Sequence, residues 1–232
     1  MKILITRPLE DAEETAAKLA ALGHHGVVAP LLATDFIMGP PPDLAGVQAV
    51  LFTSANGVKA WQRRAGGHDV TAFAVGPQTT DAAKAAGFTD VRNADGDSRS
   101  LARLVQDQAW PDAGTLLHVH GGEGSALAQE LGRHGFQMRE AVLYRVIPAA
   151  IPPEAADLLG AGTLDAALFF SPRSAGIFRD LAQKQHWPTE RLLAACISAA
   201  AAQALAPLSF AQIRIAAAPN QAALLACLDP GR

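Results

Sequence analysis

The sequence predicts an α/β fold in which helices cover parallel sheets, and three observations support this fold class. Short apolar runs without polar alternation, typical of strands buried on both faces, alternate along the chain with segments of helical periodicity. Of the 232 residues, 50% are apolar but only 6% are aromatic, which favours helix-covered sheets over a β-sandwich. In addition, one segment with the pattern strand, serine, helix occurs twice.

The repeated segment comprises Val47–Trp61 and Leu164–Phe178. In both copies the apolar run stops at a serine, and helical spacing follows. A serine at this position can cap the helix, and the backbone N–H groups of the first turn can then bind an anion. The matching residues recur at one constant offset: Ala49, Leu51, Phe52 and Ser54 return as Ala166, Leu168, Phe169 and Ser171.

The chain before this segment supplies a strand, a helix and two extended segments. The helix carries apolar residues at helical spacing and has Gly23 as its stop signal. A glycine followed by three prolines, Gly39 to Pro42, then ends regular structure. The expected elements are a strand at Lys2–Ile5, a helix at about Asp11–Leu22, a strand at Val27–Ala29 and an extended segment at Leu31–Met38.

From Val47 onward, strands and helices alternate regularly, which indicates right-handed βαβ units. A proline-bearing passage at 145–153 interrupts the alternation, which then resumes. The expected strands are Ala49–Thr53, Val70–Val75, Asp90–Arg92, Thr115–His120, Gln137–Tyr144, Ala166–Phe170, Ala194–Ile197 and Ile213–Ala216. The expected helices are Asn56–Arg64, Thr79–Ala86, Ser100–Gln108, Ser125–His134 and Gln221–Leu228, with others after Ser171 and Ser198.

The repeat also predicts how the chain divides. The second copy lacks its last βαβ piece, and this piece lies at the N-terminus, where Leu4 to Gly23 aligns with Leu116 to Gly135. The prediction is therefore two flavodoxin-like lobes related by a permuted repeat. One lobe contains 1–33 and 150–232, the other 40–142, and connectors at 31–39 and 142–149 form a two-stranded ribbon. Because open α/β sheets bind ligands at the carboxyl ends of their strands, we expect the active-site cleft between the lobes.

Charge and composition restrict the function and the compartment. A net charge of −3 argues against a general binder of nucleic acid or of acidic membranes. The two cysteines, Cys196 and Cys227, lie in apolar sequence and are expected to be buried free thiols in a reducing compartment. The first apolar run is too short for a signal peptide, and no stretch reaches the ~20 apolar residues of a membrane span. We expect a cytoplasmic protein.

Hydroxyls, glycines and cations gather where the predicted strands end and helices begin. Such groups can bind carboxylates or phosphates through backbone N–H groups and side chains. The alternative for each serine or threonine is a plain helix cap. The candidates are Thr6-Arg7, Ser54-Ala55-Asn56, Gly76-Pro77-Gln78-Thr79, His120-Gly121-Gly122, Tyr144, Ser171-Pro172-Arg173 and Ser198.

The sequence gives little support for a metal site, a nucleotide-binding site or a catalytic nucleophile. His118 and His120 can share one face of a strand, but no carboxylate or cysteine completes a ligand set nearby, so no metal site is expected. The phosphate-loop, dinucleotide-binding and nucleophile-elbow motifs are missing from the sequence.

Taken in order, short motifs along the whole chain resemble those of the uroporphyrinogen-III synthase family. They are L-I-T-R-P (4–8), F-T-S-A-N-G-V (52–58), A-V-G-P-Q-T (74–79), V-L-Y-R (142–145), F-F-S-P-R-S-A (169–175) and C-I-S (196–198). The resemblance implies a cyclising hydro-lyase of tetrapyrrole (haem) biosynthesis. Such an enzyme converts linear hydroxymethylbilane, which carries eight carboxylates, to uroporphyrinogen III with loss of water. It inverts the terminal pyrrole ring through a spiro intermediate. The resemblance also implies no cofactor and no metal, a monomer, and transient contact with the enzyme that makes the substrate.

The resemblance further implies roles for single residues. Tyr144 matches the connector tyrosine proposed to help the terminal hydroxyl leave, and Thr79 matches a threonine of the G-x-x-T motif. The other matches are expected to face the substrate through side chains or backbone N–H groups. With Thr79, the substrate-binding set is Arg7, Ser54, Ala55, Asn56, Gly76, His120, Gly121, Ser171, Pro172, Arg173 and Ser198.

Two departures from the family pattern leave alternatives open. Ala200 and Ala201 stand where some relatives have threonine, and His120 and Ser125 stand where many bacterial relatives have arginine. The chain could therefore be an inactive paralogue. A two-lobed protein that binds a small molecule or an anion without chemistry would also explain a cleft, although not the whole motif set.

Overall fold

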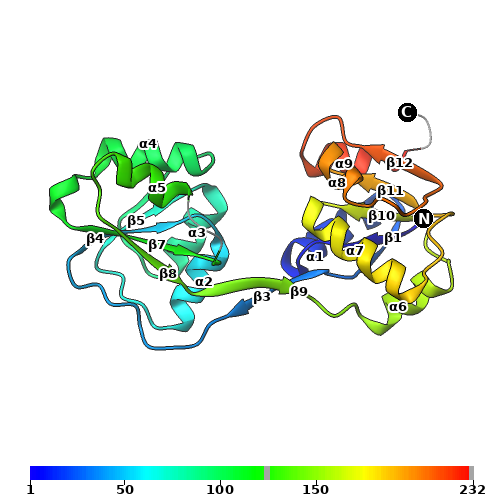
Figure 1. The fold of residues 1–232 in the computed structure, drawn as a ribbon, viewed down its shortest axis with the longest axis horizontal. Helices are drawn as coiled ribbons and strands as arrows, with labels where there is room; N and C mark the ends of the chain where they lie inside the picture. Colours follow the sequence, from blue (N-terminus) through cyan, green and yellow to red (C-terminus); the bar gives the residue numbers. More distant parts are fainter. Residues whose placement is uncertain (123–125, 230–232) are drawn as a thin grey trace. The chain divides into compact units, whose positions relative to one another are not determined.

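The computed structural model describes residues 1–122 and 126–229. By internal contacts the chain divides into two compact units. Lobe 1 consists of Met1–Ala33 with Ile147–Arg232, and lobe 2 of Thr34–Val146 (Figure 1). Among the described residues, no helix is both long enough and apolar enough to cross a membrane.

Lobe 1 contains a five-stranded parallel sheet in the spatial order β12-β11-β10-β1-β2. Counted along the lobe's own chain, this is the order 2-1-3-4-5 of flavodoxin-like folds. The strands are β1 (Lys2–Ile5), β2 (His25–Val28), β10 (Ala166–Phe169), β11 (Leu193–Cys196) and β12 (Gln212–Ile215).

Both faces of this sheet carry a hydrophobic core, which explains why the central strands show no polar alternation. In β10, Phe169 faces one core and Leu168 the other, and both are fully buried. Phe178 packs in the first core, and Leu19 and Leu224 pack in the second. The helices are α1 (Leu9–Ala21), α6 (Pro153–Gly160), α7 (Pro172–Gln185), α8 (Ala199–Gln203) and α9 (Gln221–Ala226).

Lobe 2 has a second five-stranded parallel sheet, in the order β6-β5-β4-β7-β8. Its two faces also carry separate cores, one around Phe52 and Trp61 and the other around Phe73 and Leu101. The strands are β4 (Val47–Phe52), β5 (Thr71–Ala74), β6 (Val91–Asn93), β7 (Thr115–His120) and β8 (Met138–Val142). The helices are α2 (Ala55–Arg63), α3 (Pro77–Ala85), α4 (Ser98–Gln108), the short 3₁₀ helix η1 (Pro111–Ala113) and α5 (Ala126–Arg133).

The two sheets have the same spatial plan but different chain orders. β4, β5 and β6 correspond to β10, β11 and β12, and β7 and β8 correspond to β1 and β2. The β1–α1–β2 piece of lobe 1 comes first in the chain, whereas its counterpart comes last in lobe 2. When the strands of each lobe are numbered along the chain, the spatial order is therefore 2-1-3-4-5 in lobe 1 and 3-2-1-4-5 in lobe 2. This is the arrangement that a permuted repeat produces.

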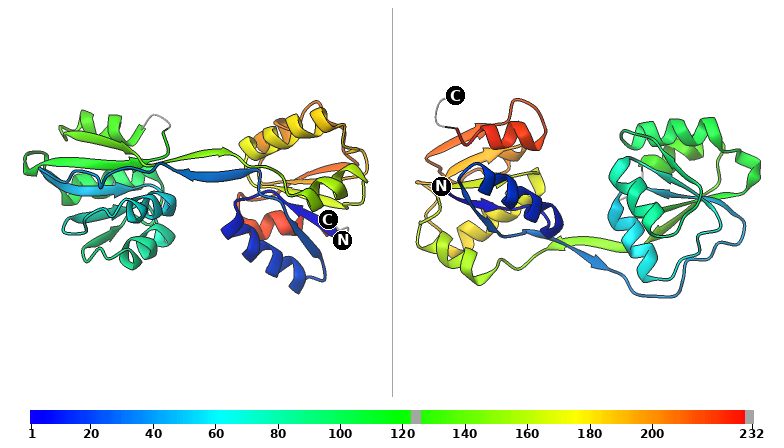
Figure 2. Two further views of the ribbon diagram at one scale, coloured as in Figure 1. Left: turned by 90° about the horizontal axis from the view of Figure 1, so that it is seen from below. Right: turned by 180° about the vertical axis from the view of Figure 1, so that it is seen from behind.

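A two-stranded ribbon is formed by β3 (Leu32–Phe36) and β9 (Tyr144–Pro148), and Figure 2 shows the two strands side by side. The N–H of Ile37 donates to the carbonyl of Leu143 (2.9 Å), and the N–H of Ala149 donates to the carbonyl of Leu31 (3.0 Å). Since the residue numbers run in opposite directions, the strands are antiparallel.

One expectation about local structure is wrong, and α6 (Pro153–Gly160) is absent from the expected elements. The predicted strand Gln137–Tyr144 is not continuous: β8 ends at Val142, and a separate strand, β9, begins at Tyr144 in the ribbon. Leu143 between them is buried in the core of lobe 2, so the chain turns inward there before it leaves the sheet. Helix α6 was not expected, although Pro153 at its first position is a favourable start signal.

Candidate active site

In lobe 2, β4 and β7 are neighbouring parallel strands from which the chain continues in opposite directions, to β5 on one side and to β8 on the other. Ligands of open α/β sheets bind at such a switch point, outside the carboxyl ends of the strands. Ser54 comes two residues after the end of β4, and Gly121 comes directly after β7. Two predicted site residues therefore lie at the switch point of this sheet.

Tyr144 contacts both of these residues. Its ring lies against Gly121, where a Cβ would come within 2.8 Å of the tyrosine Cε2. Its side chain hydrogen-bonds to the side chain of Ser54, and the residue is only 6% exposed. Burial raises the pKa of Tyr144, and the hydrogen bond from Ser54 acts in the opposite direction. At neutral pH the phenol keeps its proton and can donate it.

Ser54 also caps helix α2, because its Oγ accepts a hydrogen bond from the N–H of Asn56 (3.1 Å). In lobe 1, Ser171 caps α7 by accepting from the N–H of Ser174 (3.1 Å), and Ser198 caps α8 by accepting from the N–H of Ala201 (3.3 Å). All three serines are thus helix caps. Capping is compatible with a binding role, since a capped helix still has further N–H groups in its first turn.

The third predicted element of lobe 2 is the start of α3. Gly76 is the N-cap residue with extended backbone, and Pro77 takes the first helical position. Thr79 is 4% exposed in the first turn, and the neighbouring Thr80 donates its hydroxyl to the carbonyl of Gly76 (3.0 Å). The Thr79 side chain is therefore buried at the N-terminal end of α3.

Lobe 1 has the equivalent switch point between β10 and β1. The Thr6 hydroxyl after β1 donates to the carbonyl of Leu168 in β10 (2.6 Å) and ties the two strand ends together. Ser171 is half-buried at the start of α7, whereas Pro172 and Arg173 in the first turn of this helix are exposed.

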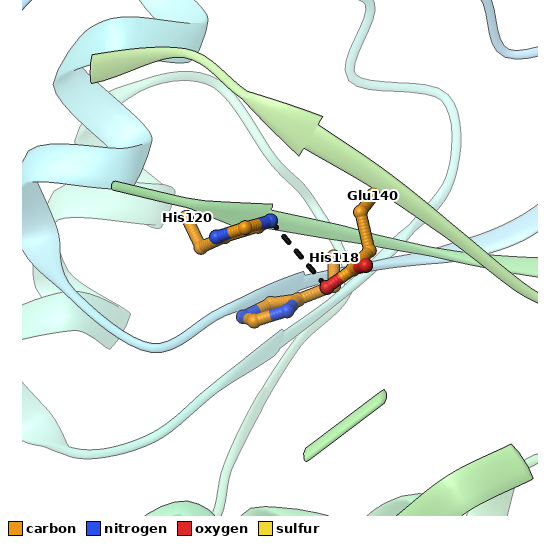
Figure 3. Close-up of side chains that lie close together, drawn as sticks. All are labelled: His118, His120 and Glu140. Carbon is orange, nitrogen blue, oxygen red and sulfur yellow. Dashed lines mark ion pairs between the residues drawn. The ribbon is translucent and has the colours of Figure 1, made fainter. Parts of the chain in front are cut away.

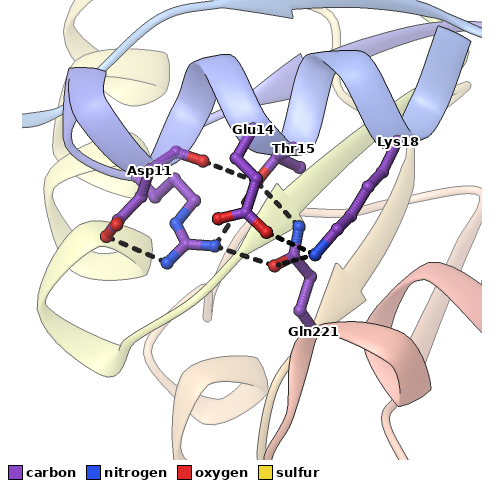
Figure 4. A network of polar contacts seen from close by, with 6 residues as sticks. Asp11, Glu14, Thr15, Lys18 and Gln221 are labelled. Carbon is purple, nitrogen blue, oxygen red and sulfur yellow. Dashed lines mark hydrogen bonds and ion pairs between the residues drawn. The ribbon is translucent and has the colours of Figure 1, made fainter. Parts of the chain in front are cut away.

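Arg7 is engaged within lobe 1 by Asp11, Thr15 and Gln221, the three partners that are labelled in Figure 4. Its guanidinium forms an ion pair with Asp11 (2.9 Å) and lies 4.5 Å from the centre of the Phe170 ring. It also donates to Thr15 Oγ1 (3.3 Å) and to Gln221 Oε1 (3.4 Å). These contacts connect the loop after β1 to α1 and α9, and Asp11 already balances the charge of the arginine.

A comparison with protein-family models finds a match to the model described as uroporphyrinogen-III synthase HemD, over residues 13–226. The chain belongs to the uroporphyrinogen-III synthase family. Its function accordingly lies in tetrapyrrole biosynthesis.

Solved uroporphyrinogen-III synthases share the fold. The crystal structure of the Helicobacter pylori 26695 protein matches with a TM-score of 0.64 and 16% identity, over 97% of this chain and 96% of that one. A mutant of the enzyme from the extremely thermophilic bacterium Thermus thermophilus matches with a TM-score of 0.52 and 20% identity, over 92% of each chain. No curated protein sequence matched this family member significantly.

The histidine pair of this family member is not isolated, and the expectation that no carboxylate lies nearby is wrong. Glu140 of β8 stands opposite His118 of β7 in the strand register. One ligand atom each of His118, His120 and Glu140 lies within 4.8 Å of the other two (Figure 3). Burial, followed by the proximity of His120, lowers the pKa of His118 to about 4. Glu140 was missed because a helix and a turn separate it from the histidines in sequence, and only strand pairing brings them together.

The departures from the family pattern have different structural outcomes. Ala201 is buried, and its N–H is used by the Ser198 cap, whereas Ala200 is exposed. His120 is 8% exposed and faces Glu140. Ser125 lies outside the described residues.

Proposed function

We propose that this chain cyclises hydroxymethylbilane to uroporphyrinogen III, releasing water and inverting the terminal pyrrole ring. The observation that carries the proposal is the contact of Tyr144 with Gly121 and Ser54 at the switch point of lobe 2, in a chain that belongs to the synthase family. This is the position where α/β sheets bind ligands, and the phenol is the proton donor there.

In the proposed first step, the phenol of Tyr144 hydrogen-bonds to the terminal hydroxyl of the substrate. The C–O bond breaks, the hydroxyl takes the phenolic proton and leaves as water, and the remaining chain becomes an azafulvene cation. Because burial raises the pKa of the phenol, the proton is present at neutral pH, and the leaving hydroxyl accepts it as the C–O bond breaks. Ser54 contributes a hydrogen bond that lowers the pKa of the phenol and so stabilises the phenolate left after proton transfer.

In the second step, the substituted α-carbon of the terminal ring attacks the cation and forms the spiro intermediate. The bond from that carbon to its original methylene bridge then breaks, and the bridge re-forms at the other α-carbon, which inverts the ring. This carbon loses its proton as the pyrrole becomes aromatic again, and the proton returns to the Tyr144 phenolate. Because both reacting ends belong to one flexible molecule, we propose that much of the rate enhancement comes from holding the chain in a ring-closing shape. Groups that bind the carboxylates are therefore as important to the proposal as the phenol.

We propose that the substrate carboxylates are bound at the first turns of helices and by the residues around them. The N–H groups and side chains at these helix starts suit anions. The proposed contacts in lobe 2 are Ser54, Ala55, Asn56, Gly76 and Thr79, and those in lobe 1 are Ser171, Arg173 and Ser198. Pro172 has no N–H group, and its proposed role is to face the substrate at the first position of α7.

Arg7 and His120 are left out of the carboxylate-binding set, as is Gly121, which lies against the Tyr144 ring. Arg7 already pairs with Asp11, so a substrate carboxylate would have to compete with that ion pair. The Nε2 atom of His120 faces the Glu140 carboxylate at 3.5 Å, and a second anion there would be repelled. Action as a monomer in the cytoplasm, on a substrate received from the enzyme that makes it, stays a prediction.

The test is to incubate the chain with freshly generated hydroxymethylbilane and to separate the uroporphyrin isomers after oxidation. We expect the type III isomer, because spontaneous closure of the linear tetrapyrrole gives type I. Heat-denatured protein provides the uncatalysed rate. Type I alone at that rate would contradict the proposal, and tight binding of the substrate without type III product would favour a binding protein.

A further inference from the structure

A cluster of three metal-ligating side chains lies on one face of the lobe 2 sheet, outside the residues assigned to cyclisation. His118 and His120 alternate with Leu117 and Val119 along β7, so both imidazoles project from the same face. Their rings are stacked, with centroids 4.9 Å apart and planes at 16°. Glu140 reaches the same place from the neighbouring strand, and Figure 3 shows the three side chains converging.

The distance between His120 and Glu140 suits a shared cation better than a hydrogen bond, and the ligand atom of His118 lies within 4.8 Å of both. His120 Nε2 lies 3.5 Å from Glu140 Oε1, which is longer than a normal N–H···O bond. The same nitrogen is buried and has no hydrogen-bond partner among the described residues. Two ligands of a tetrahedral zinc ion, each about 2.0–2.1 Å from the metal, stand roughly 3.4 Å apart. The separation between His120 and Glu140 already has this value.

We propose that His118, His120 and Glu140 bind a divalent transition metal ion, with zinc as the preferred species. Two imidazole nitrogens and one carboxylate form a recurrent zinc ligand set, which leaves the fourth position for water. Hard ions such as magnesium prefer oxygen ligands alone and are disfavoured here. The Glu140 side chain is 44% exposed, so an ion can enter from solvent on that side. The proposal does not rest on the proposed cyclisation, and no step of that reaction passes through the ion.

Neighbouring groups define how each imidazole would bind. Nε2 of His118 lies 3.4 Å from the Thr53 hydroxyl. The Thr53 hydroxyl lies outside the cluster, and an outer partner of this kind orients a metal-binding imidazole.

For His120 the present hydrogen bonding must change. The N–H of Gly122 donates to Nδ1 of His120 (3.2 Å), so the proton of the neutral ring sits on Nε2. Metal binding at Nε2 moves this proton to Nδ1, which can then no longer accept from Gly122. The proposal therefore predicts that metal binding breaks the Gly122 hydrogen bond, a consequence that a merely adventitious surface ion would not have.

The first test is a calorimetric titration of tag-free, chelator-treated protein with zinc. We expect one ion per chain, and Glu140→Gln and His120→Gln should each weaken binding by about tenfold or more. A matched control pair is offered by Glu130 and His134, an exposed glutamate and histidine 3.9 Å apart in and just after α5 of the same lobe. Glu130→Gln and His134→Gln should leave the affinity unchanged. No binding, or equal losses in control and site variants, would overturn the proposal.

Two spectroscopic measurements cover the case in which a buried-histidine variant does not fold. Cobalt(II) added to the unaltered protein should give the visible absorption of a four-coordinate site with nitrogen ligands, and Glu140→Gln, a change at a partly exposed residue, should alter it. In amide NMR spectra, zinc should shift the Gly122 resonance as its hydrogen bond is lost. An octahedral cobalt spectrum or an unmoved Gly122 signal at saturating zinc would rule the site out.

Discussion

The ring of Tyr144 lies directly on Gly121, with only 2.8 Å between the tyrosine Cε2 and the place where a Cβ of residue 121 would stand. The backbone at Gly121 does not have positive φ, so the glycine is needed here for space and not for conformation. Any side chain at position 121 would displace the phenol from Ser54.

Gly121→Ala should therefore lower the rate of cyclisation by up to about 100-fold, the cost of misplacing a reacting group by roughly 1 Å. The measurement is the initial rate of type III formation at saturating substrate. Gly132→Ala is the matched control, because a Cβ there meets no atom within 4 Å and position 132 is exposed in helix α5. An unchanged rate in Gly121→Ala would show that the position of the phenol does not limit the reaction.

Tyr144→Phe removes the proposed proton donor and keeps the packed ring. A positioned general acid typically contributes ~10²–10⁴-fold, so turnover should fall by that order if the phenol acts alone. Single changes at Ser54, Thr79 or Ser171 should cost less, because backbone N–H groups share the binding of the carboxylates. Initial rates are compared after each variant is shown to melt like the parent. A Tyr144→Phe rate above about half the parental rate would make the tyrosine a structural residue.

Ser171→Ala should destabilise lobe 1 by about 1 kcal/mol, because the N–H of Ser174 loses the cap to which it donates at 3.1 Å. Ser171→Asp, which keeps an acceptor oxygen, should restore most of the loss. Urea unfolding followed by circular dichroism measures both. Equal stability of Ser171→Ala and the parent would mean that Ser174, whose hydroxyl lies 2.8 Å from that of Ser171, replaces the cap.

Burial, and secondarily Cys227, raises the pKa of the Cys196 thiol from its usual value near 9.0 to about 12. The folded chain thus keeps this proton up to about pH 12, whereas the unfolded chain releases it above about pH 9. The stability associated with this thiol is complete below pH 9 and is lost as the pH rises through this window.

Two measurements check this prediction. Iodoacetamide at about pH 8, just below the usual thiol pKa, should modify Cys196 only after the chain is unfolded, while Cys227, which is half-buried, serves as the internal comparison. The difference in unfolding free energy between the parent and Cys196→Ala should shrink between the usual thiol pKa near 9.0 and the raised value of about 12. Fast modification of Cys196 in the folded chain would contradict the prediction.

Those parts of the fold that depend on local chemistry could be predicted from the sequence. Strand β7 was expected at Thr115–His120, where it lies, and the serines after β4 and β10 cap the helices that follow them. Local signals sufficed there because an apolar run, a capping hydroxyl and a helical period lie next to one another in the chain.

Features that depend on pairing across the sheet could not be predicted in this way. Glu140 joins the histidine pair only through the β7–β8 register, and the break at Leu143 depends on packing into the core of lobe 2. Gln221 reaches Arg7 only because α9 packs on the same face of the sheet as α1. The spacing of residues along the sequence does not predict these contacts, because they join residues that are far apart in the chain.

The permuted arrangement has a consequence for biosynthesis of the chain. In lobe 1, β1 pairs with β2 on one side and with β10 on the other, and β10 is made only after the whole of lobe 2 has been made. A nascent chain leaving the ribosome therefore holds an apolar, half-paired strand for most of its synthesis, which is a hazard for aggregation. Lobe 2, by contrast, is continuous and can fold as soon as it emerges. A chain ending at Val146 should give a protease-resistant fragment that starts near Thr34, with the preceding residues degraded, and chaperones that hold exposed strands should bind this intermediate and release the finished protein.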